Sequence, residues 1–262
     1  MLSLTPLPAL ADNYIWMLAD AEGGTAIVVD PGEAAPVLDA LEARRLELGA
    51  ILLTHHHPDH IGGTATLLER APQALVYAPF DDRIAFAHQR VGEGDRVEID
   101  APRARFEVLE VPGHTRTHIA YFGEGVLFCG DTLFSLGCGR LFEGTPAQML
   151  SSLDRLAALP ESTRVCCGHE YTLANAAFAR QVEPQNDALH ARAEQARALR
   201  EAGRPTLPSS IADERAANPF LRVDVLRVDV LPEEQPLLKA ASLGDRVARF
   251  AALRAAKDNF RA

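Results

Sequence analysis

The heptapeptide Thr54-His55-His56-His57-Pro58-Asp59-His60 is the most informative stretch of this chain, because four of its residues are histidines and a fifth is an aspartate. Imidazole nitrogens suit zinc, iron and manganese, and carboxylate oxygens suit hard divalent ions. The apolar run at 49–53 leads directly into this histidine loop and predicts a buried strand that ends there. The stretch therefore predicts a metal site at a strand end.

The spacing within the histidine loop separates its side chains into groups. Side chains alternate along an extended segment, so we expect His55 and His57 to point the same way, toward one ion. Asp59 and His60 follow where the chain turns into a helix, and we expect them to face a second ion. His56 lies between two expected ligands and points the other way, which favours a supporting role.

The composition is that of a globular protein, with 47% hydrophobic and 24% charged residues among 262. No apolar run approaches the length of a membrane span, and the first residues do not resemble a secretory signal, so we expect neither. The four cysteines are too few for a disulfide scaffold and are expected to be reduced thiols in the cytoplasm.

The charge is unevenly distributed along the chain. Residues 1–172 carry 12 Lys and Arg against 24 Asp and Glu, a net of −12, whereas residues 173–262 carry 14 against 12, a net of +2. The two parts together give the net charge of −10. This acidic balance argues against nucleic acid as a partner, since phosphate binding needs clustered cations. The asymmetry suggests two regions with different roles.

Short β-rich runs alternate with amphipathic segments up to about residue 170, which predicts an α/β fold. We expect strands at 14–18, 25–30, 49–54, 74–77, 106–111, 125–131 and 163–168, and helices at 34–47, 61–71 and 146–159.

The composition changes after Tyr171, and the rest is Ala-rich, dotted with Arg and broken by prolines. It predicts a small helical domain without strands, so we expect domains at 1–171 and 172–262. The helices are expected at 173–182, 187–202, 209–216 and 242–256. Leu221-Arg-Val-Asp224 recurs as Leu226-Arg-Val-Asp229, which we interpret as a local duplication in a loop.

Three more residues complete the predicted metal site. His114, Asp131 and His169 each follow an apolar run and a glycine, so each loop can carry its side chain to one rim of the sheet. Seven ligands suit two divalent ions that share one carboxylate. We assign His55, His57 and His114 to the first ion. Asp59, His60 and His169 are assigned to the second ion, and Asp131 is expected to bridge the two.

Each of these residues also has a plain structural reading. Alone, His114 or His169 would be interpreted as a structural histidine and Asp131 as a turn or helix cap, and only their conjunction at successive strand ends favours a metal site. His118 is expected to support the ligands. His88 and His190 have no such context and are interpreted as surface histidines. We expect zinc as the metal. Iron and manganese stay open as alternatives, because His/Asp sites accept all three.

Several motifs carry a family resemblance over nearly the whole chain. Two of them, the histidine loop and Pro-Gly-His-Thr at 112–115, resemble the metallo-β-lactamase superfamily. Four more resemble the glyoxalase II family of hydroxyacylglutathione hydrolases: Gly-Asp-Thr-Leu-Phe at 130–134, Gly-Cys-Gly-Arg-Leu-Phe-Glu-Gly at 137–144, Cys-Gly-His-Glu-Tyr-Thr at 167–172 and Asn-Pro-Phe-Leu-Arg at 218–222. The resemblance implies an αββα sandwich with a helical C-terminal domain. It also implies hydrolysis of S-D-lactoylglutathione to glutathione and D-lactate, the second step of methylglyoxal removal.

The resemblance also implies contacts to glutathione, at Arg140, Phe142, Tyr171, Arg254 and Lys257. Arg140 stands where the family usually has lysine, and it can still pair with a carboxylate. Phe142 stands where tyrosine is usual, so one polar contact is lost. Because Arg254 and Lys257 are three residues apart on an expected helix, they should share one face and attract an anionic substrate.

The expected reaction is attack of a metal-activated hydroxide on the thioester, with Asp59 orienting the nucleophile and Asp131 joining the two ions. The chain is expected to act as a monomer on a small glutathione thioester. Two other readings stay open: a glutathione persulfide dioxygenase of the same superfamily, and a non-catalytic glutathione-binding module. Oxygen uptake with glutathione persulfide would favour the first, and absence of thioester turnover in a metal-loaded sample the second. A secreted β-lactamase and a nuclease are disfavoured, by the absent export signal and by charge.

Overall fold

The computed structural model describes residues 2–20, 24–225 and 245–261. It divides into two compact units, each made of segments distant in sequence. The first unit contains Met1–Glu110, Thr117–Gly130 and Cys166–His169. The second contains Val111–Arg116, Asp131–Val165 and Glu170–Ala262. The domain boundary expected at residue 171 stays a prediction.

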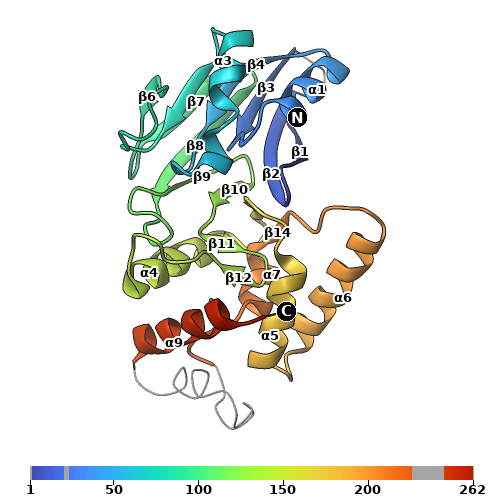
Figure 1. Ribbon diagram of the computed structural model, residues 1–262, viewed down its shortest axis with the longest axis vertical. Helices are drawn as coiled ribbons and strands as arrows, with labels where there is room; N and C mark the ends of the chain where they lie inside the picture. Colours follow the sequence, from blue (N-terminus) through green and yellow to red (C-terminus); the bar gives the residue numbers. More distant parts are fainter. Residues whose placement is uncertain (1, 21–23, 226–244, 262) are drawn as a thin grey trace. The chain divides into compact units, whose positions relative to one another are not determined.

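The first unit begins with a six-stranded sheet in the order β1-β2-β3-β4-β5-β6 (Figure 1). The first three strands are antiparallel, and β3 to β6 are parallel. The strands span Leu2–Ala9, Asn13–Asp20, Gly24–Val29, Leu46–Leu52, Leu75–Ala78 and Gln89–Arg90.

Helices cover one face of this sheet. Val37 and Leu41 of α1 (Ala35–Arg44) and Leu67 of α3 (Thr64–Arg70) belong to the same buried cluster as inward residues of the sheet. Residues of β2 are buried on both faces up to Ala19, which fits a central strand in a layered sandwich.

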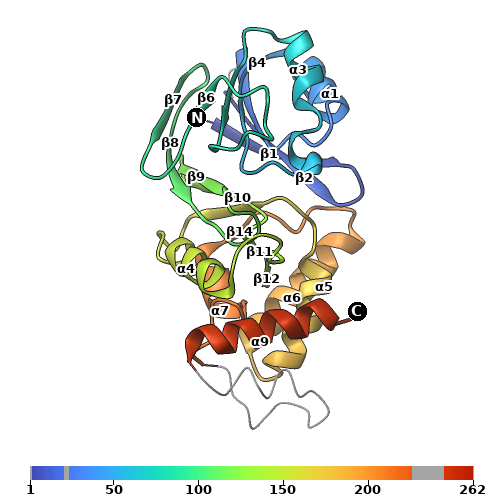
Figure 2. The ribbon, with the colours of Figure 1, turned by 60° about the vertical axis from the view of Figure 1, so that its left-hand side comes forward.

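A second sheet in the first unit consists of antiparallel strands in the order β7-β8-β9-β10 (Figure 2). They span Arg96–Asp100, Arg103–Glu110, Ile119–Gly123 and Val126–Gly130. The end of β13 (Arg164–Cys167) lies beside β10, where the Gly168 amide donates to the Gly130 carbonyl at 3.0 Å. The fully buried Tyr121 hydroxyl donates to the carbonyls of Leu53 and Tyr77, which ties this sheet to the first.

The second unit is mostly helical and also carries the short hairpin β11–β12 (Leu133–Phe134 and Gly137–Cys138). Helices α5, α6 and α7 pack in sequence, and α9 packs against α4 (Figures 1 and 2). The helices span Pro146–Ala157 (α4), Thr172–Val182 (α5), Asp187–Glu201 (α6), Ile211–Ala217 (α7) and Arg246–Asn259 (α9).

Local sequence explains several of these helix starts. Thr145 and Gln148 form a capping box before α4, with proline at the first helical position. Ser210 and Asp213 form another before α7. Asp245 caps α9 by accepting from the Ala248 amide at 2.8 Å.

Three expectations about the elements were wrong in part. The helix expected at 34–47 ends at Arg44, because Arg45 adopts a left-handed conformation with φ 54°, and the chain then enters β4. The helix expected at 61–71 is divided into α2 (Pro58–Ile61) and α3 by two glycines. A side chain at Gly62 or Gly63 would meet the backbone of Gly32 or Glu33 within 2.7 Å, so the chain can pass there only without one.

The region after residue 171 does contain a strand, contrary to expectation. Ser209–Ser210 (β14) pairs antiparallel with Arg164 and Val165 at the start of β13. A strand of two residues is too short to show an alternation of apolar and polar residues, so the sequence does not predict it. The second copy of the Leu-Arg-Val-Asp duplication and Ser242, where the last helix was expected to begin, lie outside the described residues.

Candidate metal centre and substrate-binding residues

The histidine loop follows β4 directly, and α2 begins at its proline. His55 is fully buried, and its Nε2 lies 3.1 Å from Nδ1 of His57. The two side chains therefore converge, as their alternation along an extended segment predicts. His56 turns away to the Asp81 carboxylate, with its Nδ1 3.5 Å from Oδ2.

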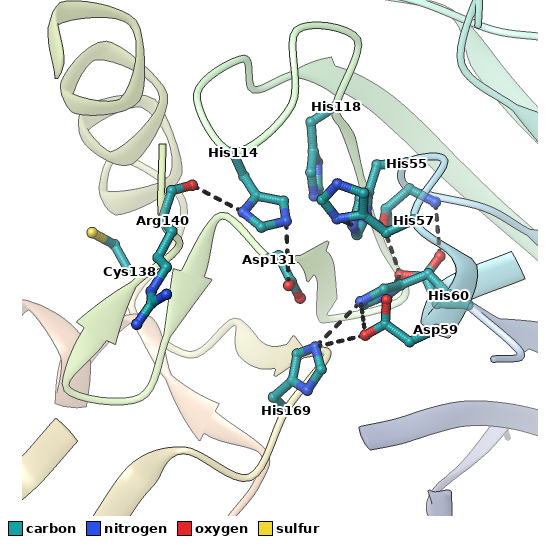
Figure 3. Close-up of polar contacts among 12 residues, drawn as sticks. His55, His57, Asp59, His60, His114, His118, Asp131, Cys138, Arg140 and His169 are labelled. Carbon is teal, nitrogen blue, oxygen red and sulfur yellow. Dashed lines mark hydrogen bonds and ion pairs between the residues drawn. The ribbon is translucent and has the colours of Figure 1, made fainter. Parts of the chain in front are cut away.

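A group of three residues, Asp59, His60 and His169, brings its ligand atoms together in the first unit (Figure 3). We call it the ligand triad. Oδ2 of Asp59 lies 3.5 Å from Nε2 of His60 and 3.4 Å from Nε2 of His169, and the two nitrogens are 3.3 Å apart. Three donors that converge so closely, two of them on buried histidines, match the chemistry of a divalent cation site.

Two carboxylates that sequence reasoning missed support this triad. Asp30 Oδ2 accepts from Nδ1 of His60 at 3.0 Å and from the Thr54 hydroxyl at 2.7 Å, while its Oδ1 accepts from the Thr54 amide. Asp12 Oδ1 accepts from Nδ1 of His169 at 2.8 Å. A carboxylate on Nδ1 fixes the tautomer and leaves Nε2 with its lone pair for an ion.

Sequence contained one signal for these supporting residues. Asp30 ends the run Thr25–Val29 and precedes Pro-Gly, so it occupies a strand end like the expected ligands. Asp12 has no such context, because it lies in the turn between β1 and β2 and meets His169 only through the fold. The antiparallel bridge between Asn13 and His169 makes this approach possible.

The remaining histidines near the loop have other contacts. The His118 ring stacks on His55 with centroids 4.5 Å apart and an interplanar angle of 18°, and its Nδ1 donates to the Ile119 carbonyl. Asp81, which faces His56, accepts hydrogen bonds from Arg83 and Thr117, and the bond from Arg83 holds the pKa of this carboxyl well below its usual range. Asp81 is therefore charged and fixes His56 away from the ligand atoms.

In the second unit, His114 and Asp131 form a buried pair with Nε2 of the histidine 3.5 Å from Oδ2 of the aspartate (Figure 3). Nδ1 of His114 donates to the Arg140 carbonyl at 2.9 Å, so Nε2 is again left as the acceptor nitrogen. Gly139 permits this packing, because a Cβ there would lie 1.9 Å from the Asp131 carbonyl oxygen.

The expected glutathione contacts all lie in the second unit. The Phe142 side chain is 62% exposed, and its ring meets the His114 ring edge-on at 5.2 Å. Tyr171 packs edge-on against Phe134 at 5.3 Å. The Arg140 side chain is exposed, and its Nε lies 3.5 Å from Oδ1 of Asp258.

Arg254 is buried, which the expected basic face shared with Lys257 does not by itself predict. Its Nη1 donates to the Cys138 carbonyl at 2.8 Å, its Nη2 donates to Asp258 at 3.0 Å, and the guanidinium lies over the Phe220 ring at 5.1 Å. The thiol of Cys138 beside it is buried, which raises its pKa to about 11 and keeps it protonated.

Lys257 is partly buried, and its Nζ donates to the Ala174 carbonyl at 3.1 Å and lies over the Phe178 ring at 5.5 Å. Burial, followed by repulsion from Arg254 and Arg140, lowers the pKa of Lys257 to about 8. We call Arg140, Arg254 and Lys257 the cation group. Among the residues that the structure describes, Asp258 is the one carboxylate ion-paired with these two arginines, so the cation group carries an excess of positive charge.

Two family models match consecutive parts of the chain. The model described as metallo-beta-lactamase superfamily matches residues 12–169, and the model described as hydroxyacylglutathione hydrolase C-terminus matches residues 170–260. In the described ranges, no helix has the length and apolar character needed to cross a membrane.

Individual relatives agree with these matches. The hydroxyacylglutathione hydrolase of Xylella fastidiosa (strain M12) is 56% identical over 257 residues, which cover 98% of this chain and 97% of the relative. ETHE1 from Myxococcus xanthus aligns with a TM-score of 0.64 and 26% identity over 98% of both chains. TTHA1623, solved in a di-iron-bound form, aligns with a TM-score of 0.54 and 30% identity over 64% of this chain and 91% of that one.

These matches confirm the predicted α/β fold with a helical C-terminal region. The sequence identity extends through both the part that carries the histidine loop and the part that carries Arg254 and Lys257. The chain belongs to the hydroxyacylglutathione hydrolase family within the metallo-beta-lactamase superfamily.

Proposed function

We propose that this protein hydrolyses the thioester S-D-lactoylglutathione to glutathione and D-lactate. The observation that carries the proposal is the ligand triad, whose three donor atoms converge in a chain that resembles hydroxyacylglutathione hydrolases along its whole length. The cation group supports the choice of substrate, because glutathione carries two carboxylates and one ammonium and is anionic.

The ligand assignment made from the sequence is retained as part of this proposal. In this proposal His55, His57 and His114 would hold one divalent ion, the ligand triad would hold a second, and Asp131 would be a ligand to both. A similar protein was solved in a di-iron-bound form, which supports iron as an alternative beside manganese. Zinc remains our proposal, because imidazole-rich sites favour it. When bound, two such ions supply Lewis acidity and lower the pKa of water from about 15.7 to about 7.

The residues of the chain contribute orientation and charge. The Asp59 side chain is 39% exposed, and its Oδ2 accepts from the side-chain Nδ2 of Asn13 at 3.1 Å. The carboxylate is therefore held in place while remaining open to a water molecule. We propose that it orients the attacking water and accepts its proton. The leaving thiol has a pKa of about 8.5, so the thiolate departs without a strong general acid.

The cation group is proposed to bind the carboxylates of glutathione. Arg140 is exposed and pairs readily with a carboxylate, while Arg254 and Lys257 are held by contacts to Cys138 and Ala174 that limit their movement. Phe142 provides an exposed apolar surface beside His114. We also propose that the protein acts as a cytoplasmic monomer, with a domain boundary at residue 171.

The proposal is tested by measuring thioester cleavage on S-D-lactoylglutathione together with the metal content of the same sample. We expect turnover in the metal-loaded protein and its loss after chelation. Oxygen uptake with glutathione persulfide, in place of thioester cleavage, would indicate a glutathione persulfide dioxygenase. Tight glutathione binding without either activity would indicate a binding module. A size-exclusion measurement of the native mass tests the monomer.

A further inference from the structure

The hairpin β11–β12 connects two residues that the proposed function uses, because Asp131 precedes it and Arg140 follows it. Its strands pair Leu133 with Cys138 and Phe134 with Gly137. The Gly139 amide donates to the Thr132 carbonyl at 3.1 Å and closes its base. The positions of the two functional residues therefore depend on how firmly this short hairpin is held.

The turn of the hairpin has an unfavourable backbone conformation. Leu136 has φ 60°, in the left-handed region that bulky residues rarely adopt. Its side chain is fully buried in a cluster formed by helices α5, α6 and α7, which includes Ala176, Leu189 and Ala217. Such a conformation persists only where its surroundings hold it, so the neighbouring contacts must stabilise this turn.

Two fully buried side chains near the end of α7 bind the backbone of the turn. Glu214 accepts from the Leu136 amide at 2.8 Å. Asn218 donates through Nδ2 to the carbonyls of Phe134 and Gly137, at 3.0 and 2.9 Å, and lies 3.0 Å from the Glu214 carboxylate. Backbone groups on both sides of the strained residue are thus bound by one adjacent pair of side chains.

Two further helices contribute to the same turn. From α5, Asn175 donates to the Ser135 carbonyl at 3.1 Å and packs so closely that a Cβ on Gly137 would lie 2.5 Å from its Nδ2. From α6, the buried Arg192 donates to the Ser135 hydroxyl at 3.2 Å and to the Thr206 carbonyl at 2.7 Å. We call the four side chains that hold the turn the turn clamp: Asn175, Arg192, Glu214 and Asn218.

The base of the hairpin meets the buried pair of His114 and Asp131. The Arg140 carbonyl accepts from Nδ1 of His114, and Gly139 packs against the Asp131 carbonyl. Arg254 donates to the Cys138 carbonyl on the second strand. A shift of the hairpin would therefore change the distance between His114 and Asp131 and would also displace the cation group.

We propose that the turn clamp, above all Glu214 and Asn218 but also Asn175, consists of positioning residues, whose buried contacts to the β11–β12 turn fix Asp131 and Arg140 for metal and substrate binding. This inference rests on the proposed function, since it assigns these two groups their roles. It explains why a fully buried carboxylate and amide are placed at this turn, where apolar side chains would leave the turn's amide and carbonyls without hydrogen-bond partners.

The test compares variants matched in stability. Asn218→Ala removes both bonds to the turn carbonyls, whereas Glu214→Gln retains a carbonyl oxygen that can accept from the Leu136 amide. Asn186→Ala is the control, because it removes the cap of α6 and a bond to Ala216 and so destabilises the same unit without touching the hairpin. For each variant we would measure the melting temperature, kcat and KM for the thioester, metal per chain, and glutathione affinity by calorimetry.

We expect Asn218→Ala to lower kcat/KM by about 10- to 100-fold, to reduce the metal bound per chain and to weaken glutathione binding. Glu214→Gln should retain activity and metal near wild-type values. The control should lose melting temperature while keeping the kinetic constants and the metal. A folded Asn218→Ala protein with wild-type metal content, glutathione affinity and kcat/KM would overturn the proposal.

If Asn218→Ala does not fold, Asn175→Ala decides in the same way, because it removes a single bond to the turn. Unchanged metal content and kinetics in that variant would likewise overturn the proposal. Failure of the wild-type protein to cleave the thioester would instead overturn the proposed function. In that case the metal content and glutathione affinity of the same variants still test the positioning role.

Discussion

The histidine loop and the β11–β12 hairpin hold side chains with proposed functional roles by different means. In the histidine loop four of the expected ligands lie within seven consecutive residues, and the Asp30 carboxylate orients one of them, His60. In the hairpin the functional residues are few, and side chains from three helices fix the turn between them. The proposed ligands of the first region therefore come mainly from one short stretch of sequence, whereas the second region depends on buried contacts from three helices.

This difference predicts which substitutions act on metal binding and which act on substrate binding. Changes to the supports of the histidine loop should lower metal affinity. Changes to the cation group should raise KM, because we propose that those side chains bind the part of the substrate that does not react.

The largest effect among single supports is expected for Asp30→Asn. Asparagine tolerates the left-handed backbone of this position, φ 52°, so the chain conformation is retained. If Oδ1 of the asparagine still accepts from the Thr54 amide, its Nδ2 takes the place of the oxygen that accepts from Nδ1 of His60. A donor at this position favours the tautomer of His60 with its proton on Nε2, and that nitrogen can then no longer bind a metal ion. We expect a loss of about 10- to 100-fold in metal affinity, measured by competition with a chelator. Asp39→Asn, on the exposed side of α1, is the control and should bind metal normally.

A smaller effect is expected for Arg254→Met, which keeps the apolar stem and removes the bonds to the Cys138 carbonyl and Asp258. We expect the free energy of unfolding to fall by about 1–3 kcal/mol, since a buried carbonyl loses its partner. KM should rise by about tenfold, which corresponds to roughly 1.4 kcal/mol of lost binding, while kcat changes little. Steady-state kinetics and chemical denaturation check both. Arg197→Met, an exposed residue of α6, should change neither. An unchanged KM for Arg254→Met would remove this residue from the cation group.

The cation group should also make substrate binding depend on pH. Because the pKa of Lys257 is lowered to about 8, the ammonium is present below that pH and is lost above it, so KM should rise by a few-fold as the pH passes 8. Between about pH 8 and 10.5 the native state binds fewer protons at this group than the unfolded chain, so its contribution makes the free energy of unfolding rise with pH. Lys257→Arg should keep KM constant through this range. The same rise of KM in both proteins would show that another group is responsible.

The smallest effect is expected for Phe142→Tyr, which restores the hydroxyl that the family usually has. The side chain is exposed, so the change should not alter stability. One additional hydrogen bond to the peptide, worth about 0.5–1.5 kcal/mol, should lower KM by a few-fold. Kinetics with lactoylglutathione check this, with Phe80→Tyr, another exposed phenylalanine, as the matched variant. A KM unchanged or raised would argue against a contact between residue 142 and the peptide.

The sequence predicts the strands near the histidine loop and the convergence of His55 with His57, because apolar runs and alternation are local properties. It does not predict that Asp12 meets His169, since that contact requires the turn after β1 to approach the end of β13. It also does not predict that α1 ends at Arg44, because an arginine such as Arg45 rarely adopts the left-handed conformation that ends the helix here.

The turn clamp shows the same limit in the second unit. The Asn-Pro-Phe-Leu-Arg motif at 218–222 indicates the family, yet nothing in it shows that the Asn218 amide binds carbonyls more than eighty residues earlier in the chain. Burial likewise separates Arg254 from Arg140, which composition and spacing treat as equivalent cations. Such contacts are properties of the folded core and leave no periodic pattern.

The most direct test of the central claim is a titration of metal into the metal-free protein, with thioester cleavage and bound metal measured on each sample. We predict that activity on S-D-lactoylglutathione follows the filling of two ions per chain, and that Asp131→Ala binds fewer ions and loses turnover. Full activity with one ion per chain, or in the Asp131→Ala protein, would contradict the two-metal hydrolase.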